Sequence, residues 1–134
     1  MRLETTAATI LVLEDAESRR QQLCHALREA GYRVVPARSG IEAQWLHDHG
    51  AWNADLLLTG FAPVELDGYH PGFAVGALLE RIPILFISDM DRLESVRRGL
   101  ILPGAPYLRY PAPPGLLRRT VRQALSGPRR QPLH

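Results

Sequence analysis

An acidic pair, Glu14 and Asp15, directly follows the apolar run from Thr9 to Leu13. A run of β-branched and aliphatic residues without polar alternation predicts a buried strand, so we expect the pair at the carboxyl end of that strand. Both carboxylates would then lie at that edge of the sheet, where they could take part in chemistry or, because strand ends are commonly polar, serve solvation alone.

The stretch from Asp55 to Gly68 predicts a second buried strand that feeds a polar loop. Its apolar part, Leu56 to Leu58, is typical of a central strand in a parallel sheet. In open parallel sheets, ligands and chemistry gather at the carboxyl edge. This strand delivers Thr59 and Gly60 to that edge, and neither side chain carries a charge. We therefore expect a site at this loop, with no carboxylate where the strand ends.

Five apolar runs alternate with stretches of helical periodicity along the chain. This alternation predicts a doubly wound parallel sheet with right-handed crossovers. We therefore predict an α/β, flavodoxin-like fold, a five-stranded parallel sheet of order 2-1-3-4-5 flanked by five helices. The predicted strands cover about 9–13, 32–36, 55–60, 82–87 and 107–110, and the predicted helices about 16–30, 40–49, 69–81, 91–100 and 116–125.

Two of the predicted helices differ from the others in their composition. In the helix from about 40 to 49, Ile41, Trp45 and Leu46 form a thin apolar stripe that we expect to face the sheet. The helix from about 69 to 81 contains Pro71, Gly72 and Gly76. Each Gly lowers helix propensity by about 1 kcal/mol relative to Ala, so we expect this helix to be the weakest.

The length of 134 residues predicts one domain. We divide it into an N-terminal extension (1–8), a folded body (9–126) and a disordered basic tail (127–134), because the tail has too little apolar content to pack. Cys24 is the single cysteine, and no apolar stretch approaches the length of a membrane span, which together indicate a cytoplasmic protein without a membrane partner. The net charge is +2, and aromatic residues are only 7% of the chain, so the sequence does not favour nucleic-acid binding.

Several motifs, in order and spacing, make the chain resemble the receiver domain of two-component response regulators. The resemblance runs from about Ala8 to Ser126. The motifs are Ile10 to Asp15, Asp55 to Leu58, Leu66-Asp67-Gly68, Ile82 to Ser88, Gly104-Ala105, and Tyr107-Leu108 followed by Pro111. The resemblance implies a signalling domain in which an acidic pair binds Mg²⁺ and an aspartate after the third strand accepts a phosphoryl group.

The family's functional positions are only partly conserved in this chain. By resemblance, Glu14 and Asp15 correspond to the acidic pair, Ser88 to the hydroxyl that contacts the phosphoryl group, and Tyr107 to the aromatic switch residue. The acceptor position falls on Gly60 when counted from Asp55 or Asp67, and on Thr59 when counted from Pro63. Neither residue has a carboxylate. The position of the family's lysine falls on Tyr110.

The resemblance therefore implies a degenerate receiver, a non-enzymatic domain in two-component phosphorelay signalling that acts by protein–protein interaction. Mg²⁺ binding is expected to be weak at most, because one of three carboxylates is missing, and no other cofactor is implied. The implied partner is a histidine kinase, a downstream signalling protein or a second copy. Its contact surface would lie on the fourth helix, fifth strand and fifth helix, which carry Arg97, Tyr107 and Leu116.

Two alternatives remain open at this stage. The chain could still be phosphorylated on a different acceptor, Thr59 or Asp67. It could also sense a small molecule or an anion in the vacated pocket, where Gly60 leaves room and Ser88, Thr59 and Arg109 could supply polar contacts.

Overall fold

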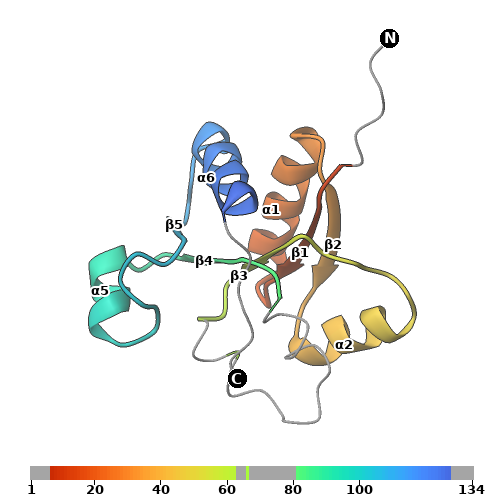
Figure 1. Ribbon diagram of the computed structural model, residues 1–134, viewed down its shortest axis with the longest axis horizontal. Helices are drawn as coiled ribbons and strands as arrows, with labels where there is room; N and C mark the ends of the chain where they lie inside the picture. The colour runs from red at the N-terminus through yellow and green to blue at the C-terminus, as the bar shows by residue number, and fades with distance from the viewer. Residues whose placement is uncertain (1–6, 63–65, 67–80, 128–134) are drawn as a thin grey trace.

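The chain forms one sheet of five parallel strands, ordered β2-β1-β3-β4-β5 (Figure 1). The computed structural model describes residues 7–62, 66 and 81–127. The strands are β1 (Thr9–Leu13), β2 (Arg33–Ala37), β3 (Leu56–Thr59), β4 (Ile84–Ser88) and β5 (Tyr107–Arg109). The predicted fold and strand order are confirmed. Most of the predicted helix over about 69–81, most of the extension 1–8 and the tail beyond Gly127 lie outside the described residues, so those predictions stay untested.

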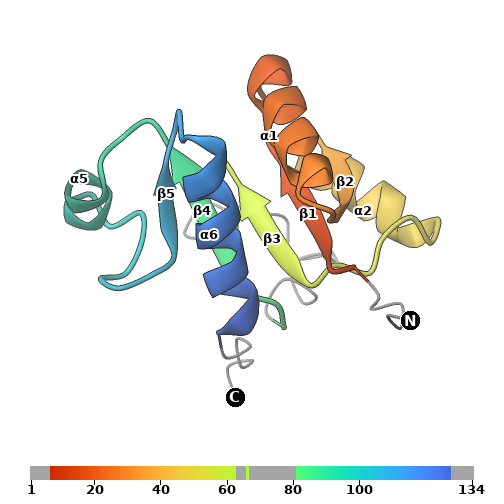
Figure 2. The same ribbon diagram turned by 90° about the horizontal axis from the view of Figure 1, so that it is seen from above.

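Four helices flank the sheet within the part of the chain that the structure describes: α1 (Glu17–Glu29), α2 (Gly40–Asp48), α5 (Arg92–Arg97) and α6 (Pro114–Ser126). The helices α1 and α6 lie side by side over one face, α2 lies on the opposite face, and α5 lies beyond β5 (Figures 1 and 2). Within the described ranges, no helix is long and apolar enough to span a bilayer.

Each central strand is buried on both faces, which explains the absence of polar alternation in its sequence. Because successive side chains point to opposite faces, β1 contributes to two separate clusters. Ile10 and Val12 pack in the cluster beneath α1 and α6, whereas Leu11 and Leu13 pack in the cluster beside α2. Burying a side chain of this size stabilises the fold by about 2 kcal/mol. These two layers hold the ends of the strands, and the residues that follow them, in fixed positions.

The predicted apolar stripe of α2 is wrong for Ile41 and Trp45, whereas Leu46 does pack against the core. Ile41 and Trp45 are 70% and 58% exposed, and the Trp45 ring stacks on His49 at 3.9 Å. The buried residues of the helix are Gly40 and Ala43. Trp52 is buried, and its Nε1 donates a hydrogen bond of 2.9 Å to the carbonyl oxygen of Ala43. Because this indole packs against the backbone of α2, a small residue is required on the inner face of the helix.

Candidate functional site

The first and third strands bring Glu14 and Gly60 together at the carboxyl edge of the sheet. Leu13 is the register partner of Thr59, so the residues that follow these two are neighbours. The backbone N–H of Gly60 donates a hydrogen bond of 3.0 Å to the carbonyl oxygen of Leu13. This pairing fixes the main chain at residue 60 directly beside the acidic pair.

The side chain of Glu14 fills the space into which a side chain at position 60 would project. A Cβ atom added to Gly60 would lie 2.1 Å from Oε1 and 2.9 Å from Cδ of Glu14. Thr59 is oriented differently: it is wholly buried, and its Oγ1 accepts a hydrogen bond of 2.9 Å from the N–H of Phe61. Of the two positions considered from sequence, Gly60 therefore faces the acidic pair, whereas the Thr59 hydroxyl closes a buried turn.

Glu14 is an ionisable residue in an unfavourable environment, with only 3% of its surface exposed. Its Oε2 accepts a hydrogen bond of 2.9 Å from the N–H of Ala16, but Oε1 is buried and has no hydrogen-bond donor among the described residues. Loss of hydration raises the pKa of the Glu14 carboxyl above its usual range, and the Ala16 hydrogen bond and the Arg19 charge only partly offset this. Asp15, by contrast, is exposed.

Arg19 supplies the positive charge closest to this carboxylate that the structure describes. Its Nη1 lies 3.8 Å from Oε1 of Glu14, and its guanidinium lies over the ring of Tyr110, 4.5 Å from the centroid. The Tyr110 hydroxyl in turn donates a hydrogen bond to Oε1 of Gln22. The residue at the expected lysine position therefore packs against an arginine of α1. All 16 basic residues of the chain are arginines, so a guanidinium is the only side-chain cation available besides histidine.

Sequence reasoning missed Arg19 and its neighbour Arg20. The Arg20 guanidinium donates hydrogen bonds of 2.9 and 3.4 Å to the carbonyl oxygens of Glu14 and Asp15, which fixes the backbone between β1 and α1. The available signal was the position of both arginines in the first turn or so of the helix that follows the acidic pair. Helical geometry directs such residues back toward the N-terminal end of the helix.

Ser88 lies at the end of β4, half-buried, where the sequence predicted it. Its Oγ accepts a hydrogen bond of 3.1 Å from the N–H of Met90, so the hydroxyl stabilises the turn that follows β4. Arg109, the register partner of Ser88, donates from Nε to the carbonyl oxygen of Asp89 at 3.1 Å. The guanidinium of Arg109 thus braces the loop after β4.

Tyr107 packs against its own edge of the sheet. Its ring meets Phe86 edge-on at 5.7 Å, and the Arg92 guanidinium lies 5.6 Å from the ring centroid. The hydroxyl is buried and has no hydrogen-bond partner among the residues that the structure describes. Burying a polar atom without a hydrogen bond costs free energy.

The described residues do not fit a magnesium site. Glu14 is buried and faces a guanidinium, Asp15 is exposed, and Gly60 offers no carboxylate. Across residues 7–62, 66 and 81–127, no group of three or more His, Cys, Asp or Glu side chains could hold a metal ion. Mg²⁺ needs several hard oxygen ligands in a near-octahedral shell, so we derive no step through it. Asp67 lies outside the described residues.

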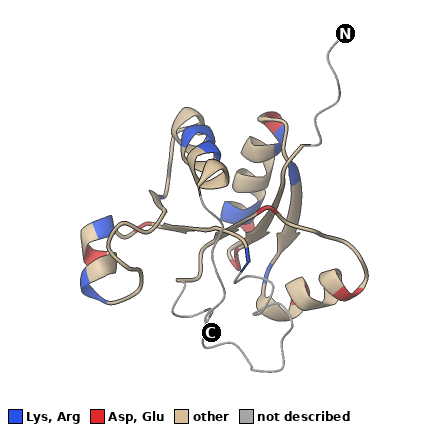
Figure 3. Ribbon diagram, viewed as in Figure 1, with Lys and Arg blue, Asp and Glu red and all other residues tan. Residues whose placement is uncertain are grey.

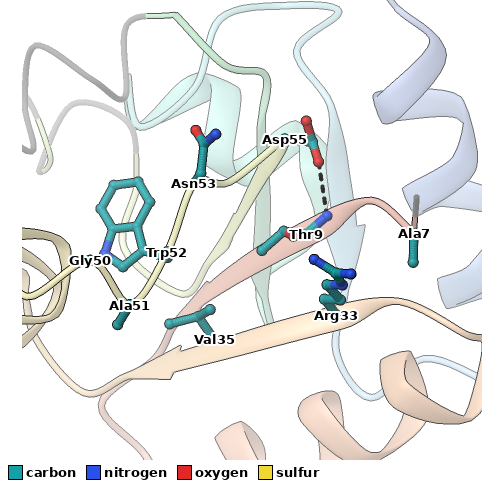
Figure 4. A pocket seen from close by; sticks show the side chains of 9 residues that line it. All are labelled: Ala7, Thr9, Arg33, Val35, Gly50, Ala51, Trp52, Asn53 and Asp55. Atoms are coloured by element: carbon teal, nitrogen blue, oxygen red, sulfur yellow. Dashed lines mark hydrogen bonds between the residues drawn. The ribbon is translucent and has the colours of Figure 1, made fainter.

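A pocket of about 470 Å³ lies at the opposite, amino edge of the sheet (Figure 4). It is lined by Thr9, Arg33 and Asp55, near the starts of three strands, together with Asn53 and other residues. Asp55 Oδ2 accepts a hydrogen bond of 2.9 Å from the N–H of Thr9. The expectation that Gly60 leaves room for a ligand at the carboxyl edge is not met, because the Glu14 carboxylate takes that space.

A scan against protein-family models found no match for this chain. Among curated proteins, it is 31% identical over 116 residues to "Two-component response regulator-like APRR9" of Arabidopsis thaliana, a match that covers 81% of this chain and 24% of that protein. It is 26% identical over 111 residues to "Two-component response regulator-like APRR5" of the same organism, covering 81% and 20%. The chain thus spans about a quarter or less of the length of these relatives.

Several solved structures of response regulators and receiver domains also resemble this chain. The chemotaxis protein CheY4 of Vibrio cholerae superposes with a TM-score of 0.65 at 24% identity, covering 88% of this chain and 98% of that one. A response regulator receiver protein from Burkholderia phymatum gives a TM-score of 0.64 at 25% identity, covering 88% and 94%. The receiver domain of the hybrid histidine kinase CckA gives 0.59 at 26% identity, covering 89% and 100%. The chain is therefore receiver-like: it has the fold of receiver domains, and its sequence is similar to response-regulator-like proteins of two-component signalling.

Proposed function

We propose that the chain is a degenerate receiver domain that transmits signals through protein contacts without phosphorylation of an aspartate. The observation that carries the proposal is the contact between Glu14 and Gly60. The residue that faces the acidic pair has no side chain, and the carboxylate of Glu14 takes its place. Acyl-phosphate chemistry needs a carboxylate nucleophile, and a cationic group or metal ion to stabilise charge on the transferred group.

The remaining residues at this edge also favour a non-catalytic domain. The lysine position carries Tyr110, whose ring stacks against Arg19. The Ser88 hydroxyl is engaged by Met90, and the acidic pair offers a single exposed carboxylate, that of Asp15. These residues leave no complete set of groups for phosphoryl transfer among those described. The cytoplasmic location expected from the single cysteine remains part of the proposal.

Phosphorylation at a different residue is the second candidate. Thr59 is a poor acceptor, because its side chain is wholly buried and its hydroxyl oxygen already accepts a hydrogen bond. A threonine hydroxyl is also a weak nucleophile unless a base activates it. The other candidate acceptor, Asp67, lies outside the described residues.

The proposed contact surface consists of α5, β5 and the start of α6. Leu93 and Leu102 are 69% and 78% exposed, and Leu116 is 37% exposed. Contiguous exposed apolar side chains mark interaction sites, and we propose that these leucines take part in one. Both α5 and α6 also carry basic residues (Figure 3), and Arg97 is one of those on α5. Tyr107 contributes the edge of β5 to the same surface. The partner would be a histidine kinase, a downstream signalling protein or a second copy of the chain.

The proposal is tested by incubating the purified protein with Mg²⁺ and acetyl phosphate and measuring its intact mass. We expect no phosphoryl adduct. A matched sample in which Asp67 is replaced, Asp67→Ala, identifies the acceptor if an adduct does form. A stoichiometric adduct in the unaltered protein that disappears in Asp67→Ala would overturn the proposal in favour of phosphorylation at that residue.

A further inference from the structure

Among the residues that the structure describes, the obstacle to a side chain at residue 60 comes from Glu14. The three heavy atoms nearest to an added Cβ are Oε1 at 2.1 Å, Cδ at 2.9 Å and Oε2 at 3.4 Å, all of that one residue. The positive-φ glycines among the described residues are Gly31, Gly50, Gly99 and Gly104, so Gly60 is not in a conformation that requires glycine. Its backbone would accept another residue, and within the described ranges it is the Glu14 carboxylate that stands in the way.

Glu14 is held in this place from both sides. One carboxylate oxygen is bound by the N–H of Ala16, and the side chain is only 4% exposed. The other oxygen faces Arg19, whose guanidinium is positioned by the ring of Tyr110. A buried carboxylate is stable in its ionised form only when a countercharge lies close by. The first helix, α1, supplies that countercharge without any bound ion.

We infer that Glu14 acts as an intramolecular ligand of the site at the carboxyl edge of the sheet, beside Gly60. Its carboxylate takes the space of an acceptor side chain, Arg19 balances its charge, and Gly60 is the residue that makes room for it. The inference rests on the proposed function, because it treats this edge as the site of a receiver-like domain. It goes further by stating that the Glu14 side chain fills the site and that Arg19 and Gly60 allow it to stay there.

Two consequences follow for the behaviour of the pocket. An added divalent cation would have to displace Arg19 from Glu14 before it could bind. A phosphoryl group or an analogue such as beryllium fluoride would then lack the metal ion that offsets its repulsion from the Glu14 carboxylate, because two anions in one desolvated space repel each other. The site is therefore closed to divalent cations and to phosphoryl groups, and it stays occupied by the Glu14 side chain.

A double-mutant cycle between residues 14 and 60 tests the inference. Gly60→Ala adds the obstructed Cβ, and Glu14→Ala removes the obstruction. We expect Gly60→Ala alone to lower the thermal midpoint by about 3 °C or more, because overpacking a filled site is destabilising. In the Glu14→Ala background, the same substitution should cause no loss. Gly115→Ala is the matched control, since nothing lies within 4 Å of a Cβ at Gly115, and it should not lower the midpoint.

An equal loss from Gly60→Ala in both backgrounds would overturn the inference, because the cost would then not come from Glu14. No loss in either background would overturn it as well, since the Glu14 side chain would then leave the pocket freely. Should Gly60→Ala fail to fold in the unaltered background, recovery of folding in Glu14→Ala supports the inference and failure in both overturns it. Phosphoryl uptake, measured by mass on the same samples, bears separately on the proposed function.

Discussion

Replacing Arg19 with methionine should destabilise the protein, and by more at neutral pH than in acid. Nη1 of Arg19 lies 3.8 Å from Oε1 of Glu14, and the two side chains are 25% and 4% exposed. At this separation and an effective dielectric constant of about 20, the attraction between unit charges is about 4 kcal/mol. Because Arg19 is partly exposed, solvent screens the pair, and we expect a loss of about 2 kcal/mol. Because methionine keeps an apolar stem against the Tyr110 ring, the substitution tests the effect of the Arg19 charge alone.

The pH dependence follows from the raised pKa of Glu14. A carboxyl whose pKa is higher in the folded than in the unfolded state binds its proton more tightly when folded. Its contribution to stability is therefore greatest below the unfolded-state pKa and is lost as the pH rises through the folded-state pKa. Without Arg19 the folded-state pKa rises further, so this loss becomes larger. In acid, where Glu14 is protonated, the charge of Arg19 has little to stabilise.

Urea denaturation of the wild type and Arg19→Met, at neutral pH and in acid below the Glu14 pKa, measures the difference. Glu14→Gln provides the control, because it keeps the shape of the side chain and removes its charge. We expect Arg19→Met to cost little in the Glu14→Gln background. The reasoning is refuted if Arg19→Met costs the same free energy at both pH values, or the same with and without Glu14→Gln. The loss would then come from packing on Tyr110.

Adjacent leucines of α6 and the buried tryptophan supply three further tests. Leu117→Ala should lower the free energy of unfolding by about 3 kcal/mol, because Leu117 is 3% exposed in the main core; a loss below about 1 kcal/mol would contradict this packing. Leu116→Asp should leave the free energy of unfolding nearly unchanged, because Leu116 is 37% exposed. It should weaken partner binding in a pull-down, or self-association in ultracentrifugation. Unchanged binding would exclude this surface. Trp52→Phe should cost about 1 kcal/mol in denaturation through loss of the hydrogen bond to Ala43, and no loss would show that this bond is not formed.

Most of the sheet was predictable because its signals are local. Buried parallel strands have continuous apolar sequences, and the predicted strand at 9–13 coincides with β1. The end of α1 was likewise set by a local feature, Gly31, which adopts a φ of 94°. Such features do not depend on distant parts of the chain.

The inner face of α2 was not predictable from periodicity alone. The sequence pattern favoured Ile41, Trp45 and Leu46, the large apolar residues of that helix, but of these three only Leu46 packs against the core. The structure buries Ala43, since the indole of Trp52 comes from the following segment and packs against the helix backbone. Tertiary packing thus decided which face of a weakly amphipathic helix points inward.

The candidate site was predictable only in its outline. The sequence showed that residue 60 lacks a carboxylate, but a glycine gives no sign of which neighbour fills the space beside it. The contact with Glu14 depends on the register of β1 and β3. The link from Arg19 to Tyr110 joins residues far apart in the chain, so it required the packing of α1 against the end of β5.

The most direct test of the central claim is an amide spectrum of the protein titrated with Mg²⁺ and beryllium fluoride. A site already filled by Glu14 should not respond, so we expect no saturable shifts in the resonances of Gly60, Ser88 and Tyr107. Saturable shifts at these three residues, with a common affinity, would mean that the pocket still binds a cation and a phosphoryl analogue. That result would contradict the account of a degenerate receiver whose pocket is closed by its own side chain.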